Sequence, residues 1–167
     1  SAGTSIGKQT VINYVGYMMD SYMLFTLQNY AAKLVEKETS PKYYFMDTGL
    51  LGLMLMDCSS AQLENLVAIE LIRRYGRENV FYFEKNVEID FYVPEEKLAI
   101  QVSLQVLDQI DTREREIGAF VKLKNFIGDA TCLLITNSEE EELDYEGVHV
   151  SVVPVWKWLL QNRKQDI

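Results

Sequence analysis

The sequence has few of the residues on which protein metal sites depend. Its 167 residues include two cysteines and one histidine. Cys58 and Cys132 form no CxxC pair and belong to no Cys/His cluster. These absences argue against a structural zinc site, and they make a reducing cytoplasm the expected location.

Long apolar runs and an excess of basic residues are also missing. No run approaches the roughly 18 apolar residues of a membrane span. Residues 1–4 lack the basic and apolar regions of a secretory signal, and Ser1 in place of an initiator Met suggests a processed or excised chain. Sixteen Lys and Arg against 25 Asp and Glu give a net charge of −9. Because phosphate binding depends on Lys and Arg, we expect no tight autonomous binding to nucleic acid.

What the sequence does contain is the composition of a globular protein, with 48% apolar and 25% charged residues. Its length suits one medium domain or two small ones. In the first 50 residues the pattern predicts a helix over 8–21 and strands at Met23–Tyr30 and Lys42–Met46, joined as a hairpin with a long tip. Asp47-Thr48-Gly49 is a turn signal. A helix followed by a hairpin is typical of the end of a winged-helix unit.

From residue 59 the pattern predicts the order α-β-β-β-α-β, with an additional strand and helix at the end. Ser59 or Ser60 can begin a helix that runs to Tyr75 and ends at Gly76. Three closely spaced strands follow, which favours an antiparallel meander. The acidic run Glu139–Glu142 predicts a solvated loop. The other predicted segments are strands Val80–Phe83, Glu88–Val93, Leu98–Val102, Ala130–Thr136 and Val148–Val153, and helices Asp111–Phe126 and Val155–Gln161.

Polar residues inside apolar segments are the candidates for a functional site. Glu64 and Glu70 lie about 120° apart on the helix from residue 59, each at the border of its apolar stripe. Asp90 lies within a strand, where Asp is disfavoured. Gln101 and Ser103 are two residues apart on the next strand and therefore share a face.

This order of elements, with an acid on the first helix and an Asp on the second strand, resembles the PD-(D/E)XK nuclease fold. More closely, residues 5–167 resemble the C-terminal region of a family of prokaryotic AAA+-type ATPases. The matching stretches are "TVINYVGYMMDSYMLF" and "SPKYYFMDTGLL", from that family's winged-helix-like segment, and "LENLVAIELIRRYG", "EIDFYV" and "AIQVS", from its nuclease-like segment. The resemblance implies that an ATPase domain of the same protein is a partner. No GxxxxGK[ST] phosphate loop occurs in this sequence itself.

The resemblance also implies which residues would carry nuclease chemistry. In such nucleases two or three carboxylates hold Mg²⁺, the metal activates a water, and a Lys helps to position that water. The matching positions are Glu64 or Glu70, Asp90, Gln101 and Ser103. Here Gln101 replaces an acid and Ser103 replaces the Lys, so the expected site is degenerate.

Each candidate also has a purely structural interpretation. Glu70 can pair with Arg73 or Arg74 on its own helix. Asp90 can be a half-exposed residue that protects a sheet edge. Gln101 and Ser103 can hydrogen-bond across the sheet.

Basic residues that could bind nucleic acid are sparse. Arg113 and Arg115 begin the next helix and could supply a positive charge, although Arg does not transfer protons at ordinary pH. Lys8 is the one basic residue of the first helix, where tyrosines suit protein contact better than phosphate.

These observations predict an α/β (α+β) chain with a winged-helix-like segment over 1–50 and a nuclease-like domain over 56–167. We expect a non-catalytic accessory or recognition region of a cytoplasmic AAA+ ATPase that binds a nucleic-acid or protein partner, with no cofactor of its own. Two alternatives stay open. One is a metal-dependent nuclease with a rearranged site, in which Asp90 and Glu64 hold Mg²⁺. The other is a protein-interaction or oligomerisation domain with no nucleic-acid role.

Overall fold

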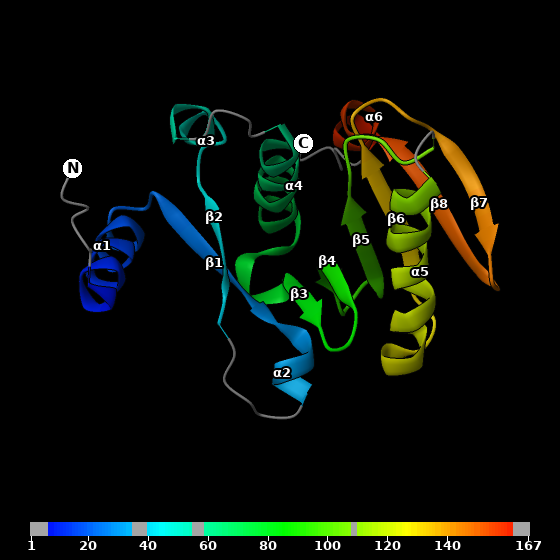
Figure 1. Cartoon of the computed structure of the whole chain (residues 1–167), viewed down its shortest axis with the longest axis horizontal. Helices are drawn as coiled ribbons and strands as arrows, with labels where there is room; N and C mark the ends of the chain where they lie inside the picture. The colour runs from blue at the N-terminus through cyan, green and yellow to red at the C-terminus, as the bar shows by residue number, and fades with distance from the viewer. Residues whose placement is uncertain (1–6, 35–39, 55–58, 108–109, 162–167) are drawn as a thin grey trace, which may run out of the picture.

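The computed structural model describes residues 7–34, 40–54, 59–107 and 110–161 (Figure 1). In this part of the chain it has a mixed α/β fold, in which six helices surround one eight-stranded sheet. The helices are α1 (Lys8–Asp20), α2 (Tyr30–Leu34), α3 (Gly49–Met54), α4 (Ser59–Tyr75), α5 (Ile110–Ile127) and α6 (Val155–Gln161), with a short 3₁₀ turn at Arg77–Asn79. The strands are β1 (Leu24–Asn29), β2 (Lys42–Phe45), β3 (Phe81–Glu84), β4 (Glu88–Val93), β5 (Leu98–Val102), β6 (Thr131–Thr136), β7 (Glu141–Tyr145) and β8 (Val148–Pro154).

The sheet is continuous from one end of the molecule to the other, in the order β2-β1-β3-β4-β5-β6-β8-β7. Strands β3, β4 and β5 form the predicted antiparallel meander. Strand β6 pairs in parallel with both β5 and β8, which agrees with its uninterrupted apolar sequence.

The hairpin of β1 and β2 joins this sheet through a parallel pairing of β1 with β3. The side chain of Asn29 extends that pairing, because its amide donates to the carbonyl of Glu84 at 2.9 Å and accepts from the Glu84 N–H at 3.1 Å. The strands of the first 50 residues and those of the later part therefore share one sheet.

Each face of the sheet has its own apolar core. Ile117 and Phe120 of α5 pack in one cluster with Leu134, whereas Leu71 of α4 packs in the other with the next residue of β6, Ile135. Because neighbouring residues of a strand point to opposite faces, α4 and α5 cover opposite sides of the sheet. Trp158 brings α6 to the same side as α4.

Most predicted elements are present, and helix α4 ends where Gly76 was expected to stop it. Gly76 has φ +83°, a backbone conformation that side chains rarely adopt and that favours glycine. Short helices α2 and α3 were not predicted; α2 lies in the expected hairpin tip and α3 follows the expected turn at Asp47.

The predicted solvated loop at Glu139–Glu142 is wrong in its second half, because Glu139 and Glu140 lie in a loop but Glu141 begins strand β7. This strand pairs with β8 at the edge of the sheet, and Leu143 is its one buried residue. An edge strand can hold acidic side chains in solvent while its backbone pairs inward, so charge density alone did not reveal it.

Helix α1 differs from the other long helices in having no buried residue. Tyr14 and Tyr17 are 61% and 64% exposed, and Val11 and Ile12 are also exposed. The helix lies beyond the β2 end of the sheet, near the N-terminus (Figure 1). None of the helices in the described ranges is long and apolar enough to cross a membrane.

Candidate functional site

The candidate site lies where strands β4 and β5 separate. Their backbone pairing ends at Phe91 and Ile100. Beyond this point β4 continues to pair with β3 through Ile89, and β5 continues to pair with β6 through Gln101. The gap that opens between the two strands exposes backbone groups that need other partners.

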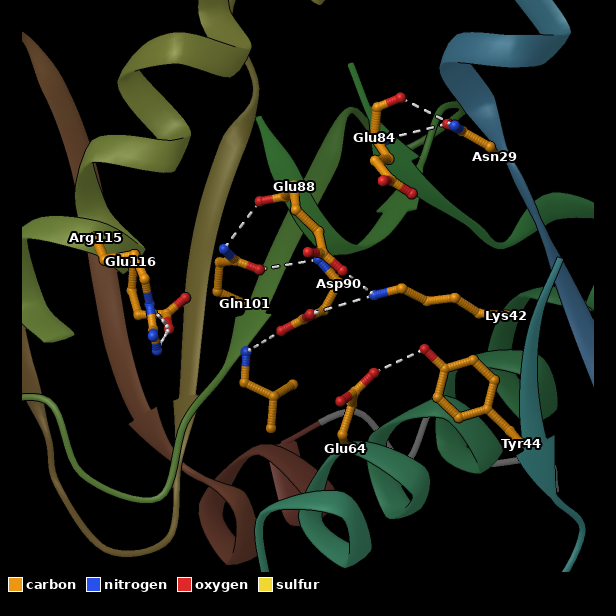
Figure 2. Close-up of polar contacts among 11 residues, drawn as sticks. Asn29, Lys42, Tyr44, Glu64, Glu84, Glu88, Asp90, Gln101, Arg115 and Glu116 are labelled. Carbon is orange, nitrogen blue, oxygen red and sulfur yellow. Dashed lines mark hydrogen bonds and ion pairs between the residues drawn. The ribbon is translucent and has the colours of Figure 1, made fainter. Parts of the chain in front are cut away.

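The side chains of Asp90 and Gln101 fill that gap (Figure 2). The Gln101 amide oxygen accepts the N–H of Asp90 at 2.9 Å, and its nitrogen donates to the Glu88 carbonyl at 3.2 Å. In return, Asp90 Oδ2 accepts the N–H of Val102 at 2.9 Å. Gln101 therefore hydrogen-bonds across the sheet, as its structural interpretation predicts, and both of its polar atoms are engaged.

Glu64 of α4 faces the same place, with Tyr44 of β2 beside it (Figure 2). The Tyr44 hydroxyl donates to Glu64 Oε1 at 2.8 Å. Burial raises the pKa of Tyr44 far above its usual value, and the Glu64 charge acts in the same direction. Tyr44 is therefore a fixed donor to Glu64 at any ordinary pH.

Strand β2 also brings Lys42 to the site. Its ammonium lies 2.6 Å from Glu88 Oε1 and 3.7 Å from Asp90 Oδ1. Burial alone would lower the pKa of Lys42, but the hydrogen bond to Glu88 and the charges of Asp90 and Glu64 outweigh it and raise that pKa. Lys42 is therefore a permanent positive charge within a group of carboxylates.

Asparagine 65 holds β2 in position over this site. Its amide oxygen accepts the N–H of Phe45 at 2.7 Å, and its nitrogen donates to the Phe45 carbonyl at 3.0 Å. Asn65 is buried on α4. This two-point contact fixes the strand that carries Lys42 and Tyr44 against the helix that carries Glu64.

The charged groups at this place line a pocket of about 480 Å³ with an acidic surplus, which Tyr44 and Asn65 do not line. Five acidic and three basic residues contribute to its wall. The charged and polar lining residues are Lys42, Glu64, Glu88, Asp90, Gln101, Glu114, Arg115, Glu116 and Lys122. On the α5 side, Arg115 pairs with Glu116 at 2.6 Å.

The electrostatics of the pocket are most visible at Asp90. Burial raises the pKa of the Asp90 carboxyl to about 7, and the charges of Glu64 and Glu116 add to that effect. The charge of Lys42 and the N–H of Val102 act in the opposite direction without cancelling it. Asp90 is thus a carboxyl that ionises near neutral pH.

The structure brings together some of the predicted site residues and not others. Glu64, Asp90, Gln101 and Arg115 line one pocket. Glu70 instead pairs with Arg73 and Arg74, at 2.6–2.7 Å, which is its structural interpretation. Its pKa is lowered, first by the hydrogen bond from Arg73.

Three further predicted residues do not line this pocket. The Ser103 hydroxyl donates to the carbonyl of Gln105 at 3.1 Å. Arg113 is half-buried near the start of α5. Lys8 is exposed on α1, a helix that the β1–β2 hairpin separates from β4, β5 and α5 (Figure 1).

Sequence reasoning missed Lys42 and Tyr44 as site residues. Their spacing of two on a strand already places both side chains on one face. What they face depends on the long-range pairing of β1 with β3, for which the sequence has no local signal.

The residues of the pocket do not fit the Mg²⁺ that the nuclease resemblance implies. Divalent cations of this kind need several free oxygen ligands. Here the Gln101 oxygen is bonded to backbone, and Lys42 lies against Asp90 and Glu88. Among the residues that the structure describes, no group of three or more His, Cys, Asp or Glu side chains is arranged to hold a metal.

Comparison with known proteins finds two matches. Residues 1–62 match the model of a domain of unknown function, DUF8612. Over 167 residues the chain is 33% identical to "Uncharacterized protein MJ1544" of Methanocaldococcus jannaschii, a match that covers 94% of this chain and 37% of that protein. The chain thus spans little more than a third of the length of this relative. No solved structure matches it.

The match to the domain model ends at residue 62, so it includes only some of the site residues. Lys42 and Tyr44 lie within residues 1–62, whereas Glu64, Asp90 and Gln101 lie after them. The pocket is therefore built from both the matched region and the chain that follows.

Proposed function

We propose that this chain is a non-catalytic accessory region of an AAA+-type ATPase, in which a winged-helix-like segment and a nuclease-like scaffold bind a protein partner. One observation carries the non-catalytic part of this proposal. Gln101 stands where the nucleases that the sequence resembles have an acid after the strand Asp. Both polar atoms of its amide hydrogen-bond to the backbone of β4. A residue held in this way stabilises the fold, because both of its polar atoms already serve backbone groups of the neighbouring strand.

The ATPase part of the proposal is supported by the sequence resemblance over residues 5–167. It is also consistent with the greater length of the M. jannaschii relative, of which this chain spans 37%. ATP binding and hydrolysis by that full-length relative are the direct test. A full-length protein that neither binds nor hydrolyses ATP would contradict the assignment to an ATPase.

Helix α1 supports a protein partner over nucleic acid. Its exposed side includes Tyr14 and Tyr17, whereas Lys8 is its one basic residue. Exposed aromatic residues with little charge are typical of protein interfaces, and a phosphate-binding helix needs Lys or Arg. The acidic surplus of the pocket also disfavours phosphate.

Fluorescence polarisation with labelled single-stranded and duplex DNA tests the choice of partner. At low salt, where phosphate contacts are strongest, we expect no change in polarisation as the chain is added. Binding that weakens steeply with salt, and that is lost in Arg115→Ala, would favour nucleic acid. A chain mass that rises with concentration, with no DNA binding, would favour the oligomerisation alternative.

A metal-dependent nuclease with a rearranged site is the second candidate, and Lys42 is the observation that favours it. Its ammonium is a fixed positive charge 3.7 Å from Asp90 Oδ1, although position 103 has no Lys. This candidate predicts cleavage of DNA or RNA in Mg²⁺ or Mn²⁺ that is abolished both in Lys42→Ala and in Asp90→Ala. Cleavage that is absent from the wild-type chain would exclude it.

A further inference from the structure

Lys42 lies at the point where the carboxylates of the pocket converge. Its ammonium is 2.6 Å from Glu88 Oε1 and 3.7 Å from Asp90 Oδ1, and it lies 5.4 Å from the centre of the Tyr82 ring. Figure 2 shows the side chain extending from β2 toward Asp90, with Glu64 on its other side. The lysine is three-quarters buried, so its charge is well sheltered from solvent.

Lys42 is the positive charge that faces the carboxylates Glu88 and Asp90, because the hydrogen bonds to Asp90 Oδ2 and Glu64 Oε1 come from uncharged donors. Asp90 Oδ2 is held by the N–H of Val102, and Glu64 Oε1 by the hydroxyl of Tyr44. Asp90 Oδ1 faces the ammonium instead. Two carboxylates lie within 4 Å of this ammonium, and the charge of Glu64 also acts on it. Negative charge gathered in this way would otherwise attract a divalent cation.

We propose that the Lys42 ammonium takes the place of a divalent cation in this pocket, acting as a counter-ion attached to β2, so that the wild-type chain needs and binds no metal there. This inference goes beyond the proposed function, because it concerns how the pocket is neutralised whatever the partner is. It also explains why the pocket residues do not fit Mg²⁺. A fixed positive charge beside Asp90 repels an incoming metal ion and occupies the oxygens that the ion would need.

The fold anchors the strand from which the Lys42 side chain reaches the carboxylates. Lys42 pairs with Leu27 in the hairpin, and Phe45 on the same strand is bonded at two points to Asn65. The strand that carries Lys42 is therefore anchored beside the carboxylates, and the ion pair with Glu88 holds the ammonium there. Removal of the charge, with the strand left in place, should open the site to a metal.

The experiment is a Mn²⁺ titration followed by the electron paramagnetic resonance signal of the free ion. Lys42→Met retains the aliphatic stem over Tyr82 but removes the charge, and Lys42→Gln is a second neutral variant. We expect each to gain one saturable Mn²⁺ site, at least about ten-fold tighter than any in the wild-type chain. The gain should disappear when Asp90→Asn is added.

Lys85→Met is the matched control, because the Lys85 ammonium lies at the same 5.4 Å from an aromatic ring, that of Phe126, but not in this pocket. It should gain no site. Wild-type binding as tight as that of Lys42→Met would overturn the proposal, and so would folded neutral variants without a site.

A measurement on the wild-type chain keeps the proposal testable if neither variant folds. The amide resonances of Asp90 and Val102 should stay sharp as Mn²⁺ is added. Paramagnetic broadening confined to these residues would show a metal in the pocket and would overturn the proposal.

Discussion

Asp90 and Gln101 each bond to the backbone of the other's strand, at the point where β4 and β5 separate. Gln101 accepts the N–H of Asp90 at 2.9 Å, and Asp90 accepts the N–H of Val102 at 2.9 Å. Two side chains thus replace the ladder bonds that the diverging strands can no longer make. The pair explains how polar residues persist inside apolar strands, because each side chain satisfies backbone groups of the other's strand.

Restoring the acid at position 101 should weaken the fold. In Gln101→Glu the carboxylate cannot donate to the Glu88 carbonyl, and it adds a negative charge beside Asp90. We expect the free energy of unfolding to fall by about 1–3 kcal/mol, measured by urea denaturation at pH 8. The same change at the exposed strand residue Gln28 should cost much less. Equal losses at the two positions would contradict the structural role of Gln101.

The ionisation of Asp90 should make stability depend on pH. Its pKa is about 7 in the folded chain and near 3.8 when unfolded, so the folded state holds the proton more tightly. As pH rises from about 4 to 7, the unfolded state loses its proton first, and the Asp90 contribution to stability declines by an amount on the order of a few kcal/mol. Urea midpoints between pH 4 and 8 should fall less in Asp90→Asn than in the wild-type chain. Glu95→Gln, an exposed control, should leave the wild-type slope intact.

The two arginines that hold Glu70 should differ in their cost. The Arg74 side chain is 8% exposed, donates to the Trp158 carbonyl at 3.1 Å and stacks on the Trp158 ring, whereas that of Arg73 is 62% exposed. We expect Arg74→Ala to lower the free energy of unfolding by about 3 kcal/mol and Arg73→Ala by about 1 kcal/mol or less. The comparison uses thermal and urea unfolding at pH 7. A larger loss in Arg73→Ala would show that α6 is not held to α4 in this way.

Asn65→Ala should loosen β2 without removing any pocket residue. It deletes both amide contacts to Phe45, at a cost of about 2 kcal/mol. Hydrogen exchange at the Phe45 amide should accelerate strongly. Asn29→Ala is the matched control, because Asn29 makes the corresponding contact to Glu84 between β1 and β3. It should accelerate exchange at the Glu84 amide and not at the Phe45 amide. Unchanged exchange at Phe45 would mean that other contacts fix β2.

The later part of the fold was largely predictable because its signals are local. Strands β4 and β5 have the predicted bounds, since alternating and continuous apolar segments mark them directly. Helix α4 ends at its glycine, and Pro154 precedes α6 as expected. Strand β7 was missed because its acidic residues reflect an exposed edge position and not a loop.

The site was only half predictable. Glu64, Asp90 and Gln101 were identified as polar exceptions within apolar segments, and the structure places them in one pocket. Lys42 reaches that pocket, and Tyr44 reaches Glu64 at its border, only because β1 pairs with β3, a contact between residues more than 50 positions apart. Lys42 thus brings to the pocket a positive charge that sequence spacing could not locate.

A calorimetric titration of Mg²⁺ into the wild-type chain at pH 8, where Asp90 is ionised, examines the neutralised pocket without any assumption about partner or substrate. We predict no saturable heat at the pocket and an isotherm that is the same for wild-type and Asp90→Asn chains. A saturable Mg²⁺ site in the wild-type chain that Asp90→Asn abolishes would contradict both the role of Lys42 and the non-catalytic assignment.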